Sequence, residues 1–176
     1  MKMIFSILIF LFFAPNQDSE KIVWNENRKL TWDDFRATPI QNANFVANTN
    51  SAIHFSYSYT IENNNVQVRS TVESFFSPKR SWYIPGKVTT HILAHEQTHF
   101  DISELHARIL RKKIEQKRFT KNVKSEIEAI YRQVDEQKIA MQKKFDAESD
   151  HSRNVKNEMR WRQYIATQLA EHNQWR

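Results

Sequence analysis

The C-terminal half of this chain contains neither proline nor glycine, because the last proline is Pro85 and the single glycine is Gly86. A segment without these two helix-breaking residues can remain helical over most of its length. The pattern predicts a first helix with Thr89 or Thr90 as its N-cap, ending near Lys117. Everything that follows this helix is expected to be helical as well.

Two further helices are indicated by apolar residues that recur at three- and four-residue steps. In the second helix these residues are Val123, Ile127, Ile130, Val134, Met141 and Phe145. In the last helix they are Val155, Met159, Trp161, Ile165 and Leu169. Residues 147–152 (Ala-Glu-Ser-Asp-His-Ser) interrupt the pattern and are expected to separate the two helices.

The part of the chain before Gly86 favours strands and loops. Residues 53–61 and 66–72 alternate apolar with polar side chains around an Asn-rich turn at 63–65, which predicts a β-hairpin. Trp32 and Phe35 are expected to be buried by a short helical turn. The fold class is therefore α+β: a small antiparallel sheet or hairpin followed by a three-helix C-terminal half. We expect one domain over residues 20–176, mainly strand and loop to 86 and helical from 87.

The N-terminus is typical of a secretory signal peptide, which we place at residues 1–19. A charged start at Lys2 precedes an apolar run over residues 4–14 that is too short to span a bilayer. An uncleaved anchor is the alternative, but removal of the signal would leave no stable membrane span. Because the chain has no cysteine, it carries neither a lipid-modified cysteine nor a disulfide. These features indicate a bacterial periplasmic or secreted protein, which we expect to be a monomer.

The formal net charge of +6 comes largely from basic residues that are dense over 108–144. Acidic residues are interleaved with them, as on a solvated helix face. No nucleic-acid recognition motif accompanies the charge, so nucleic acid is not an expected partner. Attraction to an anionic envelope surface is the more natural use of the excess charge.

The sequence His95-Glu96-Gln97-Thr98-His99 falls inside the first predicted helix. Two histidines four residues apart share one helix face, so both imidazoles can bind one Zn²⁺ ion, with Glu96 beside them as a general base. The metzincin continuation is absent, because Ile102 and Leu105 stand where it requires glycine and histidine. A third protein ligand must therefore come from another segment.

Residues 145–151, where the helical pattern breaks, contain several possible ligands. His151 is our first choice as the third metal ligand, and Glu148 is the second. Asp146 is a further alternative, as a ligand or as a residue that supports one. Glu126 also lies at a suitable distance along the chain, although its charged neighbours favour a solvent-exposed face.

Other polar residues of the first helix are predicted to support the site without binding the metal. Asp101 could orient a ligand histidine, and Glu104 is placed to pair with Arg108 one turn later. His91 and His106 lie on nearly the same face as the motif but one to two turns away, too far to bind the same ion.

Several blocks of the sequence, in the same order, resemble the bacterial family of unknown function DUF922: residues 30–35 (Leu-Thr-Trp-Asp-Asp-Phe), 81–82 (Ser-Trp), 95–108 and 145–151. The late block of that family reads approximately Tyr-Asp-x-Glu-Thr-x-His-Gly. At those places this chain has Phe145, Asp146, Glu148, Ser149, His151 and Ser152. The agreement supports a functional His151 without assigning its role.

Members of this family are described as secreted zinc-dependent proteases on the basis of prediction. The resemblance therefore implies an exported zinc metallohydrolase that acts on a peptide or protein substrate in the cell envelope. The alternative is a non-catalytic envelope-binding protein whose metal site is structural or absent. A structural site would be closed by four protein ligands, for instance with both His151 and Glu148 bound.

Overall fold

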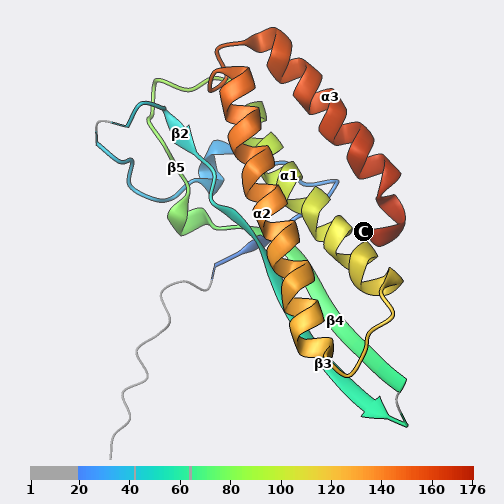
Figure 1. Ribbon diagram of the computed structural model, residues 1–176. Helices are drawn as coiled ribbons and strands as arrows, with labels where there is room; N and C mark the ends of the chain where they lie inside the picture. Colours follow the sequence, from blue (N-terminus) through green and yellow to red (C-terminus); the bar gives the residue numbers. More distant parts are fainter. Residues whose placement is uncertain (1–19, 42, 64) are drawn as a thin grey trace, which may run out of the picture.

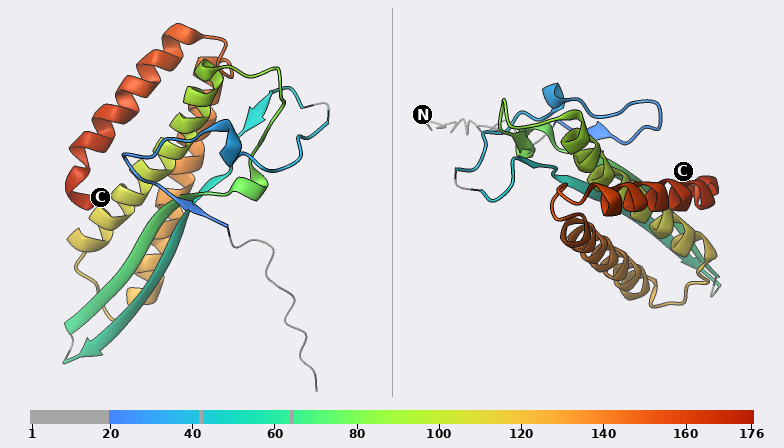
Figure 2. Two further views of the ribbon diagram at one scale, coloured as in Figure 1. Left: turned by 180° about the vertical axis from the view of Figure 1, so that it is seen from behind. Right: turned by 90° about the horizontal axis from the view of Figure 1, so that it is seen from above.

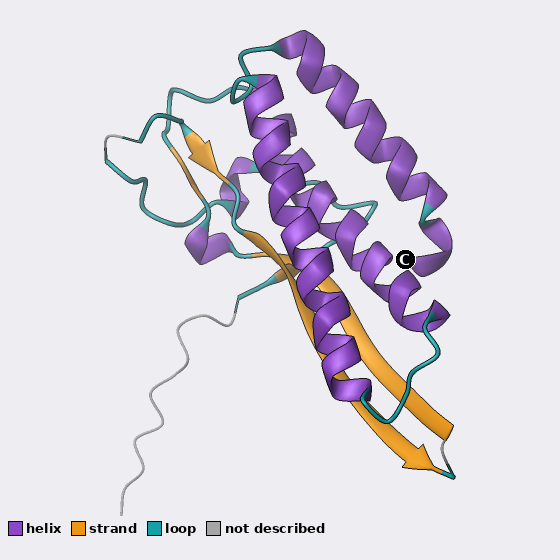
Figure 3. Ribbon diagram, viewed as in Figure 1, coloured by secondary structure: helices purple, strands orange, loops and turns teal. Residues whose placement is uncertain are grey.

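The computed structural model describes residues 20–41, 43–63 and 65–176, so the expected signal peptide lies outside the described residues. Two small antiparallel sheets precede three helices, which confirms the α+β prediction (Figures 1 and 3). No described helix is both long enough and apolar enough to cross a membrane.

The predicted hairpin forms the main sheet. Strands β3 (Ser51–Glu62) and β4 (Asn65–Phe76) pair antiparallel along their full length, and β1 (Ile22–Val23) adds to the other edge of β4. Ile53 and Val72, on the apolar face, are buried in a cluster with residues of the helices. The period-two pattern of the sequence thus marks the face that the helices cover.

A second, smaller sheet lies at the end of the molecule where the first helix begins. Strand β2 (Ala47–Asn48) pairs with β5 (Trp82–Tyr83). The predicted short helical turn is the 3-10 turn η1 (Trp32–Asp34); the following Phe35 is buried as expected, whereas Trp32 is half-buried. Another 3-10 turn, η2 (Pro78–Arg80), connects β4 to β5.

Helix α1 (Thr90–Gln116) runs through the middle of the molecule (Figures 1 and 2). It packs against the hairpin on one side and against both other helices. Thr89 caps its first turn by accepting a hydrogen bond from the backbone N–H of Ile92, as the sequence predicted. Because α1 is central, side chains on several of its faces are buried, and they include His95 and Glu96 of the His-Glu-x-x-His sequence.

Helix α2 (Val123–Ser149) ends later than the apolar pattern indicated. Residues 145–149 form the last turn of α2, so the non-helical connection begins only after Ser149. It leads to α3 (Val155–Glu171), which is followed by the terminal 3-10 turn η3 (Asn173–Trp175). Asp150, His151 and Ser152 turn the chain with positive φ angles of 48°, 49° and 75°. Helices α2 and α3 meet α1 around buried Phe145 and Ile165.

Candidate metal centre

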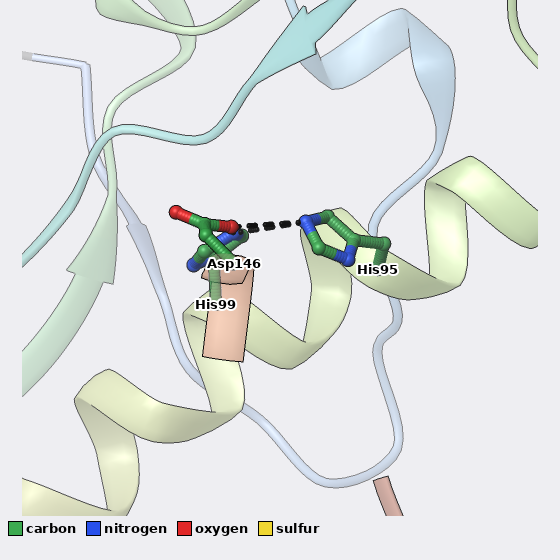
Figure 4. Close-up of side chains that lie close together, drawn as sticks. All are labelled: His95, His99 and Asp146. Carbon is green, nitrogen blue, oxygen red and sulfur yellow. Dashed lines mark hydrogen bonds and ion pairs between the residues drawn. The ribbon is translucent and has the colours of Figure 1, made fainter. Parts of the chain in front are cut away.

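His95 and His99 project from one face of α1 toward Asp146 on α2 (Figure 4). The Nε2 atoms of the two histidines are 3.2 Å apart. Oδ1 of Asp146 lies 3.2 Å from Nε2 of His95 and 2.9 Å from Nε2 of His99. Three potential ligand atoms thus converge on one point between two helices, and together they could hold a metal ion.

The hydrogen-bond partners of the histidines determine which ring nitrogens face this point. Gln142 donates from Nε2 to the carbonyl oxygen of His99 at 2.9 Å, so its Oε1 is left to accept from Nδ1 of His99. Nδ1 of His95 faces Oε2 of Glu158 across 3.5 Å. A proton on each Nδ1 leaves both Nε2 atoms with free lone pairs.

Two nitrogen lone pairs and a carboxylate oxygen at such separations repel one another unless a proton or a metal cation lies among them. The pKa values of His95 and Asp146 are shifted in the directions that favour a positive charge at this point. Burial lowers the pKa of His95, but Asp146, Glu158 and Glu96 outweigh it and raise the pKa to about 9. Burial would raise the pKa of Asp146, yet His95 and His99 hold it well below its usual range. The donor set fits a metal cation.

Glu96 lines the same cavity as the three converging residues, a hollow of about 630 Å³. Its side chain is almost fully buried, and its Oε2 has no hydrogen-bond partner among the described residues. A buried carboxylate oxygen without a partner is costly, so such an atom indicates a missing ligand or water. The carboxylate is thus placed to act on a molecule bound in the cavity.

Glu158 is a site residue that the sequence analysis missed. It lies on α3 with no exposed surface, and its Oε2 is 3.2 Å from Nε2 of His91 as well as 3.5 Å from Nδ1 of His95. His91 also contacts the carbonyl oxygen of Ser152 at 3.1 Å, which ties the α2–α3 connection to α1. The signal in the sequence was a carboxylate seven residues before Ile165, on the buried face of an amphipathic helix.

The structure places His151 at the cavity wall, while Asp146 occupies the position of a third ligand. The His151 side chain is half exposed, and its Nδ1 lies 4.0 Å from Oδ1 of Asp146. Because α2 continues to Ser149, Asp146 projects from the same face as Gln142 toward the histidines. His151 follows the end of the helix, and it is not part of the group of ligand atoms that converges on one point.

The other predicted ligands and support residues lie elsewhere. Oε2 of Glu148 accepts a hydrogen bond from Nε1 of Trp161 at 2.7 Å on the side of α3. Glu126 accepts from the backbone and side chain of Thr120 near the start of α2. Neither carboxylate belongs to the group that faces the two motif histidines.

Asp101 is not brought to the histidines either. It accepts hydrogen bonds from Nε1 of Trp24 at 2.7 Å and from Nε2 of Gln97 at 2.8 Å, and burial raises its pKa. Glu104 pairs with Arg108 at 2.9 Å, as the spacing predicted. Asp101 thus joins α1 to the N-terminal segment, whereas the Glu104–Arg108 pair lies within α1, and neither carboxylate belongs to the group that faces His95 and His99.

A family model described as a bacterial protein of unknown function, DUF922, matches residues 28–152. The chain belongs to this family. Comparison with curated proteins and with solved structures found no match. The DUF922 match includes both histidines, Glu96 and Asp146, but it ends before α3, which supplies Glu158.

Proposed function

We propose that this DUF922 protein is an exported zinc-dependent peptidase. The observation that carries the proposal is the convergence of His95, His99 and Asp146 at the wall of an open cavity that Glu96 also lines. Three protein ligands and one open position are the arrangement of a catalytic zinc site.

The separations of the ligand atoms suit zinc. Tetrahedral zinc holds nitrogen and oxygen ligands at about 2.0–2.1 Å, which puts neighbouring ligand atoms about 3.3 Å apart. The observed separations are 3.2, 3.2 and 2.9 Å. Neutral imidazoles whose Nδ1 atoms face acceptors are the form in which histidine binds zinc, and Glu158 and Gln142 supply those acceptors.

When bound, zinc would polarise a carbonyl group and make a water molecule acidic enough to attack at neutral pH. Glu96 would accept a proton from the attacking water and then deliver it to the leaving amine. Its unpartnered Oε2 is free to hold that proton. His151, at the cavity wall, is placed to contact the substrate.

An extended peptide could be held beside the metal centre by main-chain pairing. Residues 44–51, which include β2, line the cavity, while β2 pairs with β5 along one edge. Thr49 ties this segment to the metal helix by donating from Oγ1 to the carbonyl oxygen of Glu96 at 3.2 Å. A strand fixed in this way is a template for adding a substrate strand.

The first experiment is to measure the zinc content of the purified mature protein and its cleavage of a peptide library. We expect one zinc per chain and peptide cleavage, with both lost in His99→Ala. Glu96→Gln should keep the zinc and lose turnover, because it removes only the proton acceptor. Asp101→Asn is the matched control on the same helix and should behave like the parent. Turnover by zinc-loaded Glu96→Gln at the parental rate would refute this mechanism.

The competing function is a binding protein with a structural metal site. Such a site needs a fourth protein ligand, whereas the described residues present three at an open cavity. X-ray absorption spectroscopy of the zinc-loaded protein separates the two functions. Water or another exchangeable ligand at the fourth position supports the peptidase, and four protein ligands support the structural site. Export itself is tested by cell fractionation.

A further inference from the structure

The cavity at the metal centre has an uneven distribution of charge. Four basic side chains from three segments line it: Lys87, Lys138, Lys143 and Arg153. Among the described lining residues, the acidic ones are Glu96 and Asp146. Both are engaged at the metal centre, so the remainder of the lining is positively charged.

Two of these basic residues have acidic partners outside the cavity lining. Lys138 is largely buried, and its Nζ lies 2.6 Å from Oδ1 of Asp135. Arg153 lies 3.7 Å from Asp150, but both side chains are mostly exposed. An exposed pair of this kind contributes little and can open to another anion.

Lys87 and Lys143 are the two cations available to a ligand. Both are exposed, and neither forms an ion pair within the part of the chain that the structure describes. Lys143 lies three residues before Asp146 on α2, and Lys87 lies just before α1. The two cations therefore come from different elements that border the same cavity.

A larger cavity of about 880 Å³, between α1 and α3, is also lined by basic residues. There, Arg108 pairs with Glu104 at 2.9 Å and Arg176 pairs with Glu26 at 2.6 Å. Lys29 and Arg162 line the same larger cavity and form no ion pair among the described residues, so unpaired cations border both cavities.

We infer that the peptide taken by this site is acidic, with carboxylate side chains close to the bond that is cleaved. The inference rests on the proposed function and names its substrate class. Lys87 and Lys143 would contact the carboxylates, while Phe45 and Ile139, which are 38% and 43% exposed, offer apolar contacts in the same lining. A peptide that alternates acidic and apolar residues matches both kinds of contact.

Binding is measured with zinc-loaded Glu96→Gln, which should hold the peptide without cleaving it. Two fluorescein-labelled peptides differ only in glutamate or glutamine on either side of a central apolar residue. Fluorescence anisotropy gives Kd for each peptide at low and high salt. The charge-reversed pair Lys87→Glu/Lys143→Glu is compared with Lys117→Glu/Lys121→Glu. The latter makes the same change of charge at the opposite end of α1, about 27 Å along the helix from His99.

We expect the glutamate peptide to bind about tenfold more tightly, the size of two exposed ion pairs, and salt to reduce this difference. Lys87→Glu/Lys143→Glu should lose the preference for the glutamate peptide, and the control Lys117→Glu/Lys121→Glu should keep it. The inference is overturned if the two peptides bind with equal Kd, or if both double variants lose the preference for the glutamate peptide to the same extent. Failure of the zinc-loaded parent to cleave any peptide overturns the proposed peptidase instead, whatever the binding preference.

Discussion

Glu158 provides the sharpest quantitative test of how the metal centre is built. The side chain has no exposed surface and lies 3.5 Å from Nδ1 of His95, so its charge favours a proton on that nitrogen. Removing a carboxylate that orients a metal-binding histidine typically weakens metal binding about 10- to 100-fold, or about 1.4–2.7 kcal/mol. We expect about tenfold for Glu158→Gln, whose amide oxygen can still accept from His95. For Glu158→Ala, which leaves a cavity, we expect about 100-fold.

The assay is competition for zinc with a chelator of known affinity, on protein shown to be folded by circular dichroism. Glu148→Gln is the matched control, because that carboxylate is exposed and hydrogen-bonded to Trp161. The control should bind zinc within about twofold of the parent. Parental affinity in Glu158→Gln, or an equal loss in Glu148→Gln, would refute the role assigned to Glu158.

Three further results are expected. Elemental analysis after gel filtration should show that Asp146→Asn has lost most of its zinc while His151→Ala has kept it; the opposite result would favour His151 as the third ligand. Ser152→Gly should stabilise the protein by about 0.5–1 kcal/mol in urea unfolding, because its φ is +75°. Ser149→Gly, inside α2, should instead destabilise the protein by about 1 kcal/mol. If the two glycine variants change the free energy of unfolding in the same direction, the positive φ of Ser152 does not explain the effect. In metal-free protein, burial lowers the pKa of His95, but Asp146 and the nearby glutamates raise it to about 9. Protonation of His95 should therefore contribute fully to the free energy of unfolding below pH 6.5, and this contribution should be lost as the pH rises through about 9. An unfolding midpoint in EDTA that does not change over this pH range would exclude such a contribution.

The sequence predicted the elements whose structure depends on local pattern. The hairpin followed from alternation over residues 53–61 and 66–72, because period-two burial belongs to a strand that is covered on one face. The start of α1 followed from Thr89, whose side chain caps the first turn. The shared face of His95 and His99 followed from helix geometry alone.

The position of Asp146 opposite the two histidines could not be predicted with the same certainty, because it depends on where α2 ends. Helices often end at glycine, but Asp150, His151 and Ser152 adopt positive φ angles here without one. The resembling family has glycine where this chain has Ser152, so the usual indication of the helix end was missing. The apolar pattern placed the break too early, which favoured His151 as the first choice, whereas in the structure Asp146 is the residue that groups with the two histidines.

Glu158 was hidden for a different reason, since its partners are set by the docking of α3 on α1. A carboxylate without exposed surface must be offset by opposite charge or hydrogen bonds, and His91 and His95 are the groups beside it. Helix α3 lies beyond the residues that the DUF922 model matches. If His95 binds a metal, this binding and the docking of α3 should therefore be coupled, because each favours the same protonation of His95. By linkage, zinc should stabilise the packing of α3, and loosening of α3 should weaken zinc binding.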